Sequence, residues 1–253
     1  MFGALMLVVA TYVLVPLLQP LFVAQSKQNY HGHSIPSALG FTFVLSSVVV
    51  LISGGEGMPY LFAIVMLYFA LLGLVDDLLG ESDSKGIRGH FGRRTLSTGT
   101  LKALGAMGFT FALSLRLPGG WLETIINAIL IASAANFLNL LDLRPGRTGK
   151  AFIIFAFPFI ALAPSLRDYL LWILGAVVGY LPWDLREQVM MGDTGSNPLG
   201  ATLGLAAVMV LPQTAKTILA LVLVGLNLLA ERISFSRVIE DNRLLDFLDR
   251  LGR

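Results

Sequence analysis

Residues 191–200 read MGDTGSNPLG, and this polar stretch lies between two strongly apolar segments. Gly192 and Gly195 allow the backbone to turn tightly and to approach a ligand closely. Asn197 followed by Pro198 predicts the start of a helix, whose free N–H groups would favour an anion such as phosphate. Asp193 beside this start can hold a hard cation such as Mg²⁺. The alternative is an ordinary polar turn between two membrane helices.

The composition is that of an integral membrane protein. Of the 253 residues, 55% are hydrophobic and 13% are charged, and the mean hydropathy is +0.76. A soluble domain with this composition would have too few polar residues to cover its surface. Cysteine is absent, which excludes disulfides and thiol chemistry. Residues 2–24 have no basic region before them and no cleavage pattern, so we interpret them as a retained membrane helix and not a signal peptide.

Apolar segments predict an all-α, polytopic membrane protein with about nine transmembrane helices, in a range of about eight to ten. Several segments are shorter than the roughly 20 residues that a hydrocarbon core requires, so we expect them to extend into flanking polar residues. The segments are residues 2–24, 37–53, 59–75, 101–117, 123–140, 151–163, 168–181, 199–211 and 215–230.

The loops between these segments alternate between short and long, and the cations follow the long ones. Fifteen of the eighteen Lys and Arg residues belong to the long loops and the tail. The positive-inside rule therefore places the long loops in the cytoplasm and the N-terminus outside. Residues 1–232 are predicted to form the transmembrane domain and 233–253 a cytoplasmic tail. Residues 238–251 predict an amphipathic helix that lies on the membrane surface or, alternatively, packs on neighbouring loops.

Asp76 and Asp77 end the third apolar segment, where carboxylates are costly unless a cation or water is near. Adjacent residues on a helix point about 100° apart, so the two side chains are not expected to serve the same role. We expect one to face a metal ion or act as a base, and the other to be held by a lysine or a backbone group. The alternative is a solvated helix end.

Asn136, Asn139 and Asp142 fall at positions i, i+3 and i+6 near the inner end of the fifth segment. This spacing places them on one side of a helix, where their oxygens can ligate Mg²⁺ or bond a substrate. The alternative is that the amides hydrogen-bond neighbouring membrane helices together. The next cations along the chain are Arg144 and Arg147, which either bind a diphosphate or are ordinary cations of an inner loop. The same two interpretations apply to Lys85 and Lys102, which follow the aspartate pair.

These motifs together resemble the polyprenyl-phosphate N-acetylhexosamine-1-phosphate transferase superfamily, of the MraY and WecA type. Three signatures occur in the family's order: Asp76-Asp77, Asn136-x-x-Asn139-x-x-Asp142 and Gly192-Asp193-Thr194-Gly195-Ser196. The resemblance covers residues 1–232. It implies transfer of a HexNAc 1-phosphate of the GlcNAc type from a UDP-sugar to undecaprenyl or another polyprenyl phosphate, with release of UMP. Such a reaction serves cell-envelope glycan synthesis at the cytoplasmic face of a bacterial inner membrane.

The resemblance also implies roles for single residues. Asp193 and Asn139 would bind Mg²⁺, or alternatively Mn²⁺, and Asp76 or Asp77 would deprotonate or orient the lipid phosphate. The expected partners are the polyprenyl phosphate, the nucleotide sugar and the membrane, without nucleic acid, and a homodimer is left open. The candidate residues are Asp76, Asp77 and Asp193 for catalysis, Asp193 and Asn139 for the metal, and Lys85, Lys102, Asn136, Asp142, Arg144 and Arg147 for substrate binding.

The sequence departs from the family pattern where the nucleotide and the sugar would be recognised. Pro145 replaces the second acidic or amide position of the family's loop, and Met190 or Met191 replaces an aromatic that stacks on uracil. The last inner loop has no histidine and the expected final membrane helix is not found, so we do not expect MraY itself. We expect binding to depend on the diphosphate more than on the base. The alternative function is a non-catalytic protein that binds or moves polyprenyl lipids on an eroded transferase scaffold, against which the retained acids argue.

Overall fold

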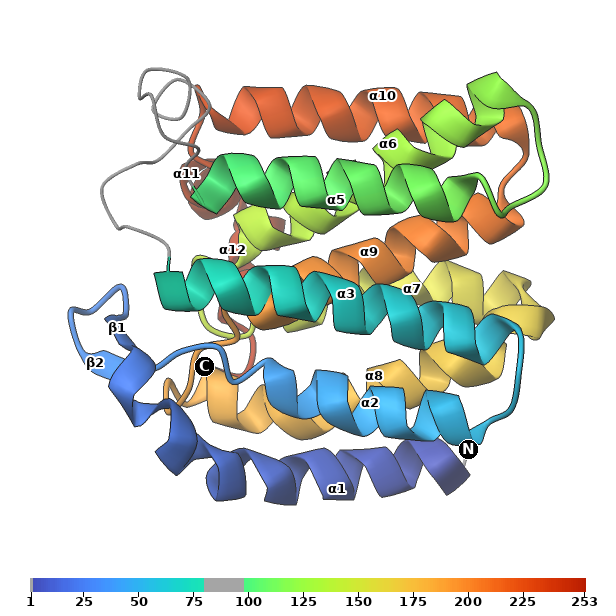
Figure 1. The fold of residues 1–253 in the computed structure, drawn as a ribbon. Helices are drawn as coiled ribbons and strands as arrows, with labels where there is room; N and C mark the ends of the chain where they lie inside the picture. The colour runs from blue at the N-terminus through green and yellow to red at the C-terminus, as the bar shows by residue number, and fades with distance from the viewer. Residues whose placement is uncertain (1, 80–97) are drawn as a thin grey trace.

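The computed structural model describes residues 2–79 and 98–253, so Lys85 lies outside the described residues. Within these ranges the chain forms long helices that run back and forth through one bundle (Figure 1). Each of the apolar segments predicted from the sequence overlaps one of them, with bounds that differ by up to several residues. They are α1 (Phe2–Leu18), α2 (Phe41–Ser53), α3 (Met58–Leu79), α5 (Thr98–Ser114), α6 (Trp121–Leu141), α7 (Arg147–Leu162), α8 (Pro164–Leu185), α9 (Asp193–Val210) and α10 (Gln213–Ala230).

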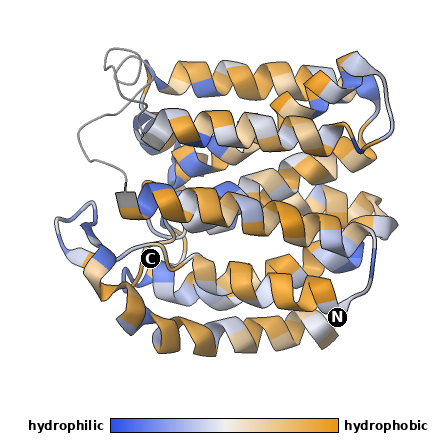
Figure 2. Ribbon diagram, viewed as in Figure 1, coloured by the Kyte–Doolittle hydropathy of each residue, from blue (hydrophilic) through white to orange (hydrophobic). Residues whose placement is uncertain are grey.

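The bundle has two unlike ends. At one end lie the hairpin of β1 (Ser26–Gln28) and β2 (Ser34–Pro36), the C-terminus and the tail helices (Figure 1, left). We call this the polar end, and it also contains the connections 142–146 and 186–192. The opposite end has the connections α2–α3, α5–α6 and α9–α10. Figure 2 shows apolar residues along the helices and many of the hydrophilic residues near their ends.

Four helices in the described ranges are long and apolar enough to cross a membrane by length and composition. They are Phe2–Gln25, Met58–Leu78, Trp121–Leu141 and Gln213–Ala230, and Phe41–Ser53 is a shorter apolar helix. This agrees with an all-α membrane protein. The total of about nine spans and the cytoplasmic placement of the polar end remain predictions.

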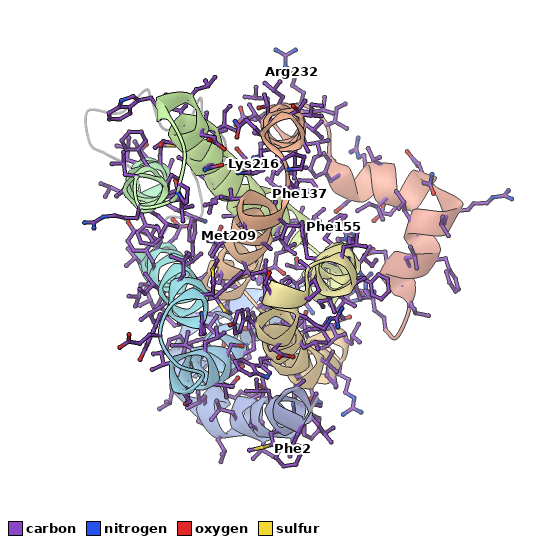
Figure 3. All side chains as sticks on the ribbon, turned by 90° about the vertical axis from the view of Figure 1, so that its right-hand side faces the viewer. Phe2, Phe137, Phe155, Met209, Lys216 and Arg232 are labelled. Carbon is purple, nitrogen blue, oxygen red and sulfur yellow. The ribbon has the colours of Figure 1, made fainter. Side chains whose placement is uncertain are left out.

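The central helix is α9, in which every residue from Thr194 to Val208 is buried. It packs on α6 so closely that a Cβ at Gly200 would collide with the carbonyl oxygen of Ala134. Small residues at such contacts allow membrane helices to approach each other. In the end-on view of Figure 3, Met209 near the end of α9 lies inside the ring of surrounding helices. The core therefore fixes the helix that begins with Asp193.

The start of α9 differs from the prediction that Asn197 caps the helix and Pro198 begins it. The helix begins at Asp193, and its N-cap is Gly192, whose φ of 68° favours glycine. Asn197 lies one turn inside, where its Nδ2 donates to the carbonyl oxygen of Asp193 at 2.8 Å. The Asn-Pro pattern misplaced the start because the asparagine side chain bonds back to the preceding turn instead of capping the helix.

Two further differences concern the long polar segments. The first helix ends at Leu18 and continues as the 3₁₀ helix η1 (Gln19–Gln25), in which a proline without an N–H stands near the start. The hairpin that follows was not predicted, because three-residue strands are too short to show an alternating pattern. The tail forms two helices, α11 (Phe235–Asp241) and α12 (Arg243–Arg250), separated by Asn242. Its Oδ1 accepts hydrogen bonds from two N–H groups of α12, so it acts as an N-cap.

Candidate active site

Asp193, the first residue of α9, is the centre of a hydrogen-bonded network at the polar end. Its Oδ1 accepts a hydrogen bond from Asn139 Nδ2 of α6 at 2.6 Å, and its Oδ2 contacts the ammonium of Lys102 from α5. The amide of Asn139 also donates to Ser196 Oγ at 2.9 Å. The two residues predicted as metal ligands are therefore in direct contact.

Asp76 on α3 faces the same network. Its Oδ2 lies 3.7 Å from Nζ of Lys102, so one ammonium lies near the carboxylates of both Asp76 and Asp193. The exposed fractions of the Lys102, Asp76 and Asp193 side chains are 19%, 26% and 24%. Two carboxylates this close would repel each other at a partly buried site, and the ammonium offsets that repulsion.

Asp77 points away from this cluster and caps α9. Its Oδ2 accepts hydrogen bonds from the N–H of Thr194 at 3.0 Å and from the Thr194 hydroxyl at 2.8 Å. Its Oδ1 pairs with Nζ of Lys27 at 2.8 Å, and its side chain is only 2% exposed. A carboxylate at this position satisfies a free N–H group and interacts favourably with the helix dipole. Of the two adjacent aspartates, Asp77 is thus the one held by a lysine and a backbone group, and Asp76 is the one that faces the cluster.

Asn136 does not join Asn139 in the network. It is exposed on α6, and no hydrogen bond within the described residues links it to Asp193. Successive steps of three residues rotate around the helix by about 60° each, so positions i and i+6 diverge by roughly 120°. The predicted role of Asn136 in substrate binding therefore rests on the sequence alone.

Asp142 is the C-cap of α6, and its environment disfavours a negative charge. Burial raises its pKa well above the ordinary value, the charges of Asp184 and Asp193 add to the rise, and the Thr148 hydroxyl opposes it. Asp184 at the end of α8 is 5% exposed, and its Oδ2 accepts a hydrogen bond from the N–H of Gly146 at 2.9 Å. The carboxyl groups of Asp142 and Asp184 thus lie close to each other at the 142–146 connection.

Arg144 and Arg147, predicted to contact a diphosphate, are both paired with acids of the tail. Arg144 Nη2 lies 2.9 Å from Glu240 Oε1, and the side chain of Arg144 is 26% exposed. Arg147 is 5% exposed, and its guanidinium forms two bonds to the carboxylate of Asp249 at 2.8 and 2.9 Å. The guanidinium of Arg147 is therefore buried and bidentately paired in this structure, and its contact with a diphosphate stays a prediction. Arg144 remains partly accessible.

The match to known sequences covers this network. The sequence model described as Glycosyl transferase family 4 matches residues 59–211, from the start of α3 to the end of α9. This range contains Asp76, Lys102, Asn139 and Asp193. The chain belongs to glycosyl transferase family 4. The family assignment agrees with the resemblance to the polyprenyl-phosphate transferase superfamily.

Family 4 relatives of this chain carry the name phospho-N-acetylmuramoyl-pentapeptide-transferase. The protein from Shouchella clausii is 26% identical over 260 residues, covering 90% of this chain and 77% of the relative. The Bacillus subtilis protein is 28% identical over 261 residues, covering 92% and 79%. The protein from Borrelia garinii subsp. bavariensis is 33% identical over 191 residues, covering 62% and 54%. These low identities agree with a divergent member of the family.

The family 4 network can present oxygen ligands to a cation. Among the described residues, no group of three or more His, Cys, Asp or Glu side chains is arranged to hold a metal ion. Asp193 and Asp76 nevertheless bring two carboxylates to one ammonium, with the amide of Asn139 beside them. Mg²⁺ commonly uses one or two carboxylates and completes its shell with water and substrate phosphates. The residues present fit an ion of this kind.

Several residues of the site were not predicted. Lys27 comes from the hairpin, and no spacing in the sequence connects it with Asp77. Burial alone would lower the pKa of Lys27, but the carboxylate of Asp77, with those of Asp193 and Asp76 beyond it, raises it above the ordinary value. Asp184 could have been predicted from the sequence, because it follows an apolar segment in the same way as Asp76 and Asp77 do.

Proposed function

We propose that this family 4 protein transfers a sugar 1-phosphate from a nucleotide diphosphate sugar to a polyprenyl phosphate. A phosphate oxygen of the lipid would form a bond to the phosphorus that carries the sugar. The bond between that phosphorus and the oxygen bridging to the nucleoside phosphate would break, releasing the nucleoside monophosphate. We further propose a HexNAc donor of the GlcNAc type, uridine as the nucleoside, and undecaprenyl phosphate as the acceptor.

The observation that carries this proposal is the convergence on Asp193. Side chains from α3, α5 and α6 meet the first residue of α9 at the polar end of an apolar bundle. The positive end of the α9 helix dipole lies at this helix start and favours an anion. A reaction between a water-soluble diphosphate and a lipid headgroup needs such a site, where water and hydrocarbon meet. The relatives named phospho-N-acetylmuramoyl-pentapeptide-transferase support the same reaction class.

We assign a different role in this reaction to each residue of the network. Asp76 would accept a proton from the lipid phosphate or orient that phosphate, because it faces the cluster and is partly exposed. Lys102 would leave its present contact with Asp193 and bind phosphate charge. Asp77 would take no direct part, since its oxygens already bond Lys27 and Thr194.

Asp193 and Asn139 would hold Mg²⁺, with Asp76 close enough to contribute. When bound, the ion would neutralise diphosphate charge and stabilise the leaving phosphate. The amide oxygen of Asn139 becomes available if the amide reverses its orientation from the one that donates to Asp193. The ammonium of Lys102 supports this assignment, because it already lies where a positive charge is stabilised by two acids.

The donor would be recognised mainly through its diphosphate. Pro145 removes a backbone N–H donor from the loop that follows α6, and no aromatic residue directly precedes Gly192. Arg144 is the loop cation that stays accessible, and a charge-assisted hydrogen bond from it would contribute about 1.5–3 kcal/mol. We therefore expect weak discrimination between uridine and other nucleosides.

The test is to incubate the purified protein with undecaprenyl phosphate, Mg²⁺ and a panel of nucleotide sugars, and to identify lipid products by mass spectrometry. The proposal expects a lipid diphosphate sugar and a nucleoside monophosphate in equal amounts. Protein carrying Asp193→Asn should give neither product. If the wild-type protein binds the lipid but forms no product with any donor, the alternative of a non-catalytic lipid-binding protein replaces this proposal.

A further inference from the structure

The tail is bound to the loop between α6 and α7 by a buried ion pair. Arg147, the first residue of α7, and Asp249, near the end of α12, are 5% and 6% exposed in their side chains. The Nε and Nη2 atoms of Arg147 bond the two carboxylate oxygens, and Nη1 donates to Ser236 Oγ of α11 at 2.9 Å. The guanidinium therefore has contacts with both tail helices.

Further contacts surround this ion pair. Arg253 Nη2 donates to Asp249 at 2.9 Å, and Arg253 Nε donates to the carbonyl oxygen of Pro145 at 3.0 Å. Lys150 donates to the carbonyl oxygen of Asp249. Burial alone would raise the pKa of Asp249, but the hydrogen bonds and charge of Arg147, with the other cations, lower it below the ordinary value. The carboxylate thus stays ionised at neutral pH and holds the end of the tail against the loop.

The same loop is held from its other side by the hairpin. The guanidinium carbon of Arg144 lies 4.3 Å from the centre of the Tyr30 ring, and Tyr30 donates to Glu187 at 2.9 Å. Glu240 of α11 pairs with Arg144 in addition. The side chain of Arg144 is therefore fixed between the hairpin and the tail. Figure 3 shows α11 and α12 beside the bundle, attached to it near α7.

The tail lies beyond residue 211, where the family match ends, whereas Arg147 lies within the match. The family pattern thus does not account for the pair of Arg147 and Asp249. A buried ion pair is costly to desolvate, and breaking it by removal of one partner leaves a buried charge uncompensated. In some proteins such a pair specifies one arrangement of the groups that it joins. The groups joined here are the tail and residues 142–147, which connect α6 to α7 and include Arg144.

We propose that Asp249 is a positioning residue, which holds the 142–147 loop through Arg147 so that Arg144 is presented to the diphosphate of the donor. This inference rests on the proposed function for its effect on the donor, but its structural part does not. The tail then substitutes for recognition groups that the loop itself lacks at Pro145. If the tail instead blocked the site, removal of the Asp249 carboxylate would speed turnover.

The first experiment measures loop position without activity. The chain has no cysteine, so Leu143→Cys and Leu244→Cys, at positions 58% and 66% exposed, allow two spin labels and a distance measurement by pulsed EPR. We expect a narrow distance distribution in the labelled protein and a broad one after Asp249→Asn. Asp249→Glu, which keeps the carboxylate, should restore the narrow distribution. Asp246→Asn is the matched control, because Asp246 pairs with exposed Arg250 on the same helix.

The second experiment measures kinetics with the same variants. Asp249→Asn should raise the KM for the nucleotide sugar by about tenfold, equivalent to about 1.4 kcal/mol, with the KM for the lipid unchanged. Asp249→Glu should recover most of this change, and Asp246→Asn should match the wild type. Should Asp249→Asn fail to fold, Glu240→Gln breaks the partly exposed pair with Arg144 and should give smaller changes of the same kind.

Three results would overturn the inference. One is an unchanged distance distribution in Asp249→Asn, and another is an equal loss in Asp246→Asn. The third is faster turnover without the carboxylate, which would make the tail a block. If the wild-type protein transfers no sugar phosphate, the proposed function fails, and the distance measurement still decides whether Asp249 fixes the loop.

Discussion

Two lysine–carboxylate pairs lie at the two ends of α6, and they differ in almost every respect. At the polar end, Lys102 contacts Asp193 and lies 3.7 Å from Asp76, while Asn139 in the last turn of α6 bonds Asp193. At the opposite end, Lys216 of α10 lies 3.7 Å from Glu123 in the first turn of α6. The Lys216 side chain is 11% exposed, so a buried lysine alone does not distinguish the two ends.

The two ends of α6 differ in how the surrounding polar groups are hydrogen-bonded. The polar network joins four helices, and the side chain of Asn139 donates to two partners within it. Near Glu123, Asn127 Oδ1 and both polar side-chain atoms of Gln213 are buried without a hydrogen-bond partner in the described part of the chain. Satisfied polar groups from several helices thus converge on the start of α9, where we propose the reaction to take place, whereas the Glu123–Lys216 pair joins α6 and α10.

The largest expected effect is on turnover after Asp76→Asn. Loss of a group that handles a proton or orients the lipid phosphate should lower kcat by about 10²–10⁴-fold. The measurement is the initial rate of lipid product formation at saturating substrates. Glu123→Gln at the opposite end is the matched control and should keep the wild-type rate. Equal losses in both variants would show that the two ends do not differ in function.

A smaller effect is expected for Arg144→Ala. Loss of one charge-assisted contact should raise the KM for the donor roughly 10- to 100-fold, with kcat changed less. Lys216→Met removes a cation at the opposite end and should leave this KM unchanged. In a competition assay, UDP, ADP, GDP and CDP should inhibit with similar strength. Strong preference for UDP together with a wild-type KM in Arg144→Ala would refute the diphosphate-centred account of donor binding.

Asp77→Ala should act on stability. It removes the acceptor for the N–H and hydroxyl of Thr194 and leaves Lys27 without its partner. We expect a loss of about 1–3 kcal/mol, seen as a lower Tm in detergent micelles. At temperatures where the variant stays folded, its KM values should be near wild type. A variant with unchanged Tm and abolished turnover would instead assign Asp77 to the chemistry.

The smallest effect is expected for the pair at the opposite end. The 3.7 Å separation and the 31% exposure of Glu123 indicate a weak interaction. Glu123→Gln should therefore change the stability by less than about 1 kcal/mol. The same thermal unfolding measurement compares it directly with Asp77→Ala. If Glu123→Gln lost more stability than Asp77→Ala, the opposite end and not the polar end would contribute more to the stability of the fold.

Sequence reasoning succeeded where the determining pattern is local. Apolar runs located the long helices, because a helix in hydrocarbon must be apolar over its exposed length. The 100° rotation between neighbours predicted that Asp76 and Asp77 would separate in role. The family resemblance, and not a local pattern, implied that Asn139 and Asp193 share a metal ion, and the two side chains are in direct contact.

The remaining features depend on contacts that no local pattern encodes. Lys27 reaches Asp77 from a hairpin with three-residue strands. Arg147 was expected to bind phosphate because it belongs to a cationic loop. Its pairing with Asp249 was not foreseen, because Asp249 lies 102 residues away in sequence. A cationic loop has the same sequence whether its arginines are free or paired with an acidic tail. Only the folded chain separates Arg144, which stays partly accessible, from Arg147, which does not.

The central claim is that Asp193 and Asn139 hold the metal ion of a sugar-phosphate transfer at the polar end. The most direct measurement is the rate of lipid product formation as Mg²⁺ is titrated, in wild type, Asp193→Asn and Asn139→Ala, with folding checked by thermal unfolding. The account predicts a saturable Mg²⁺ response in the wild type and its loss in both folded variants. A wild-type Mg²⁺ response in both variants would contradict it.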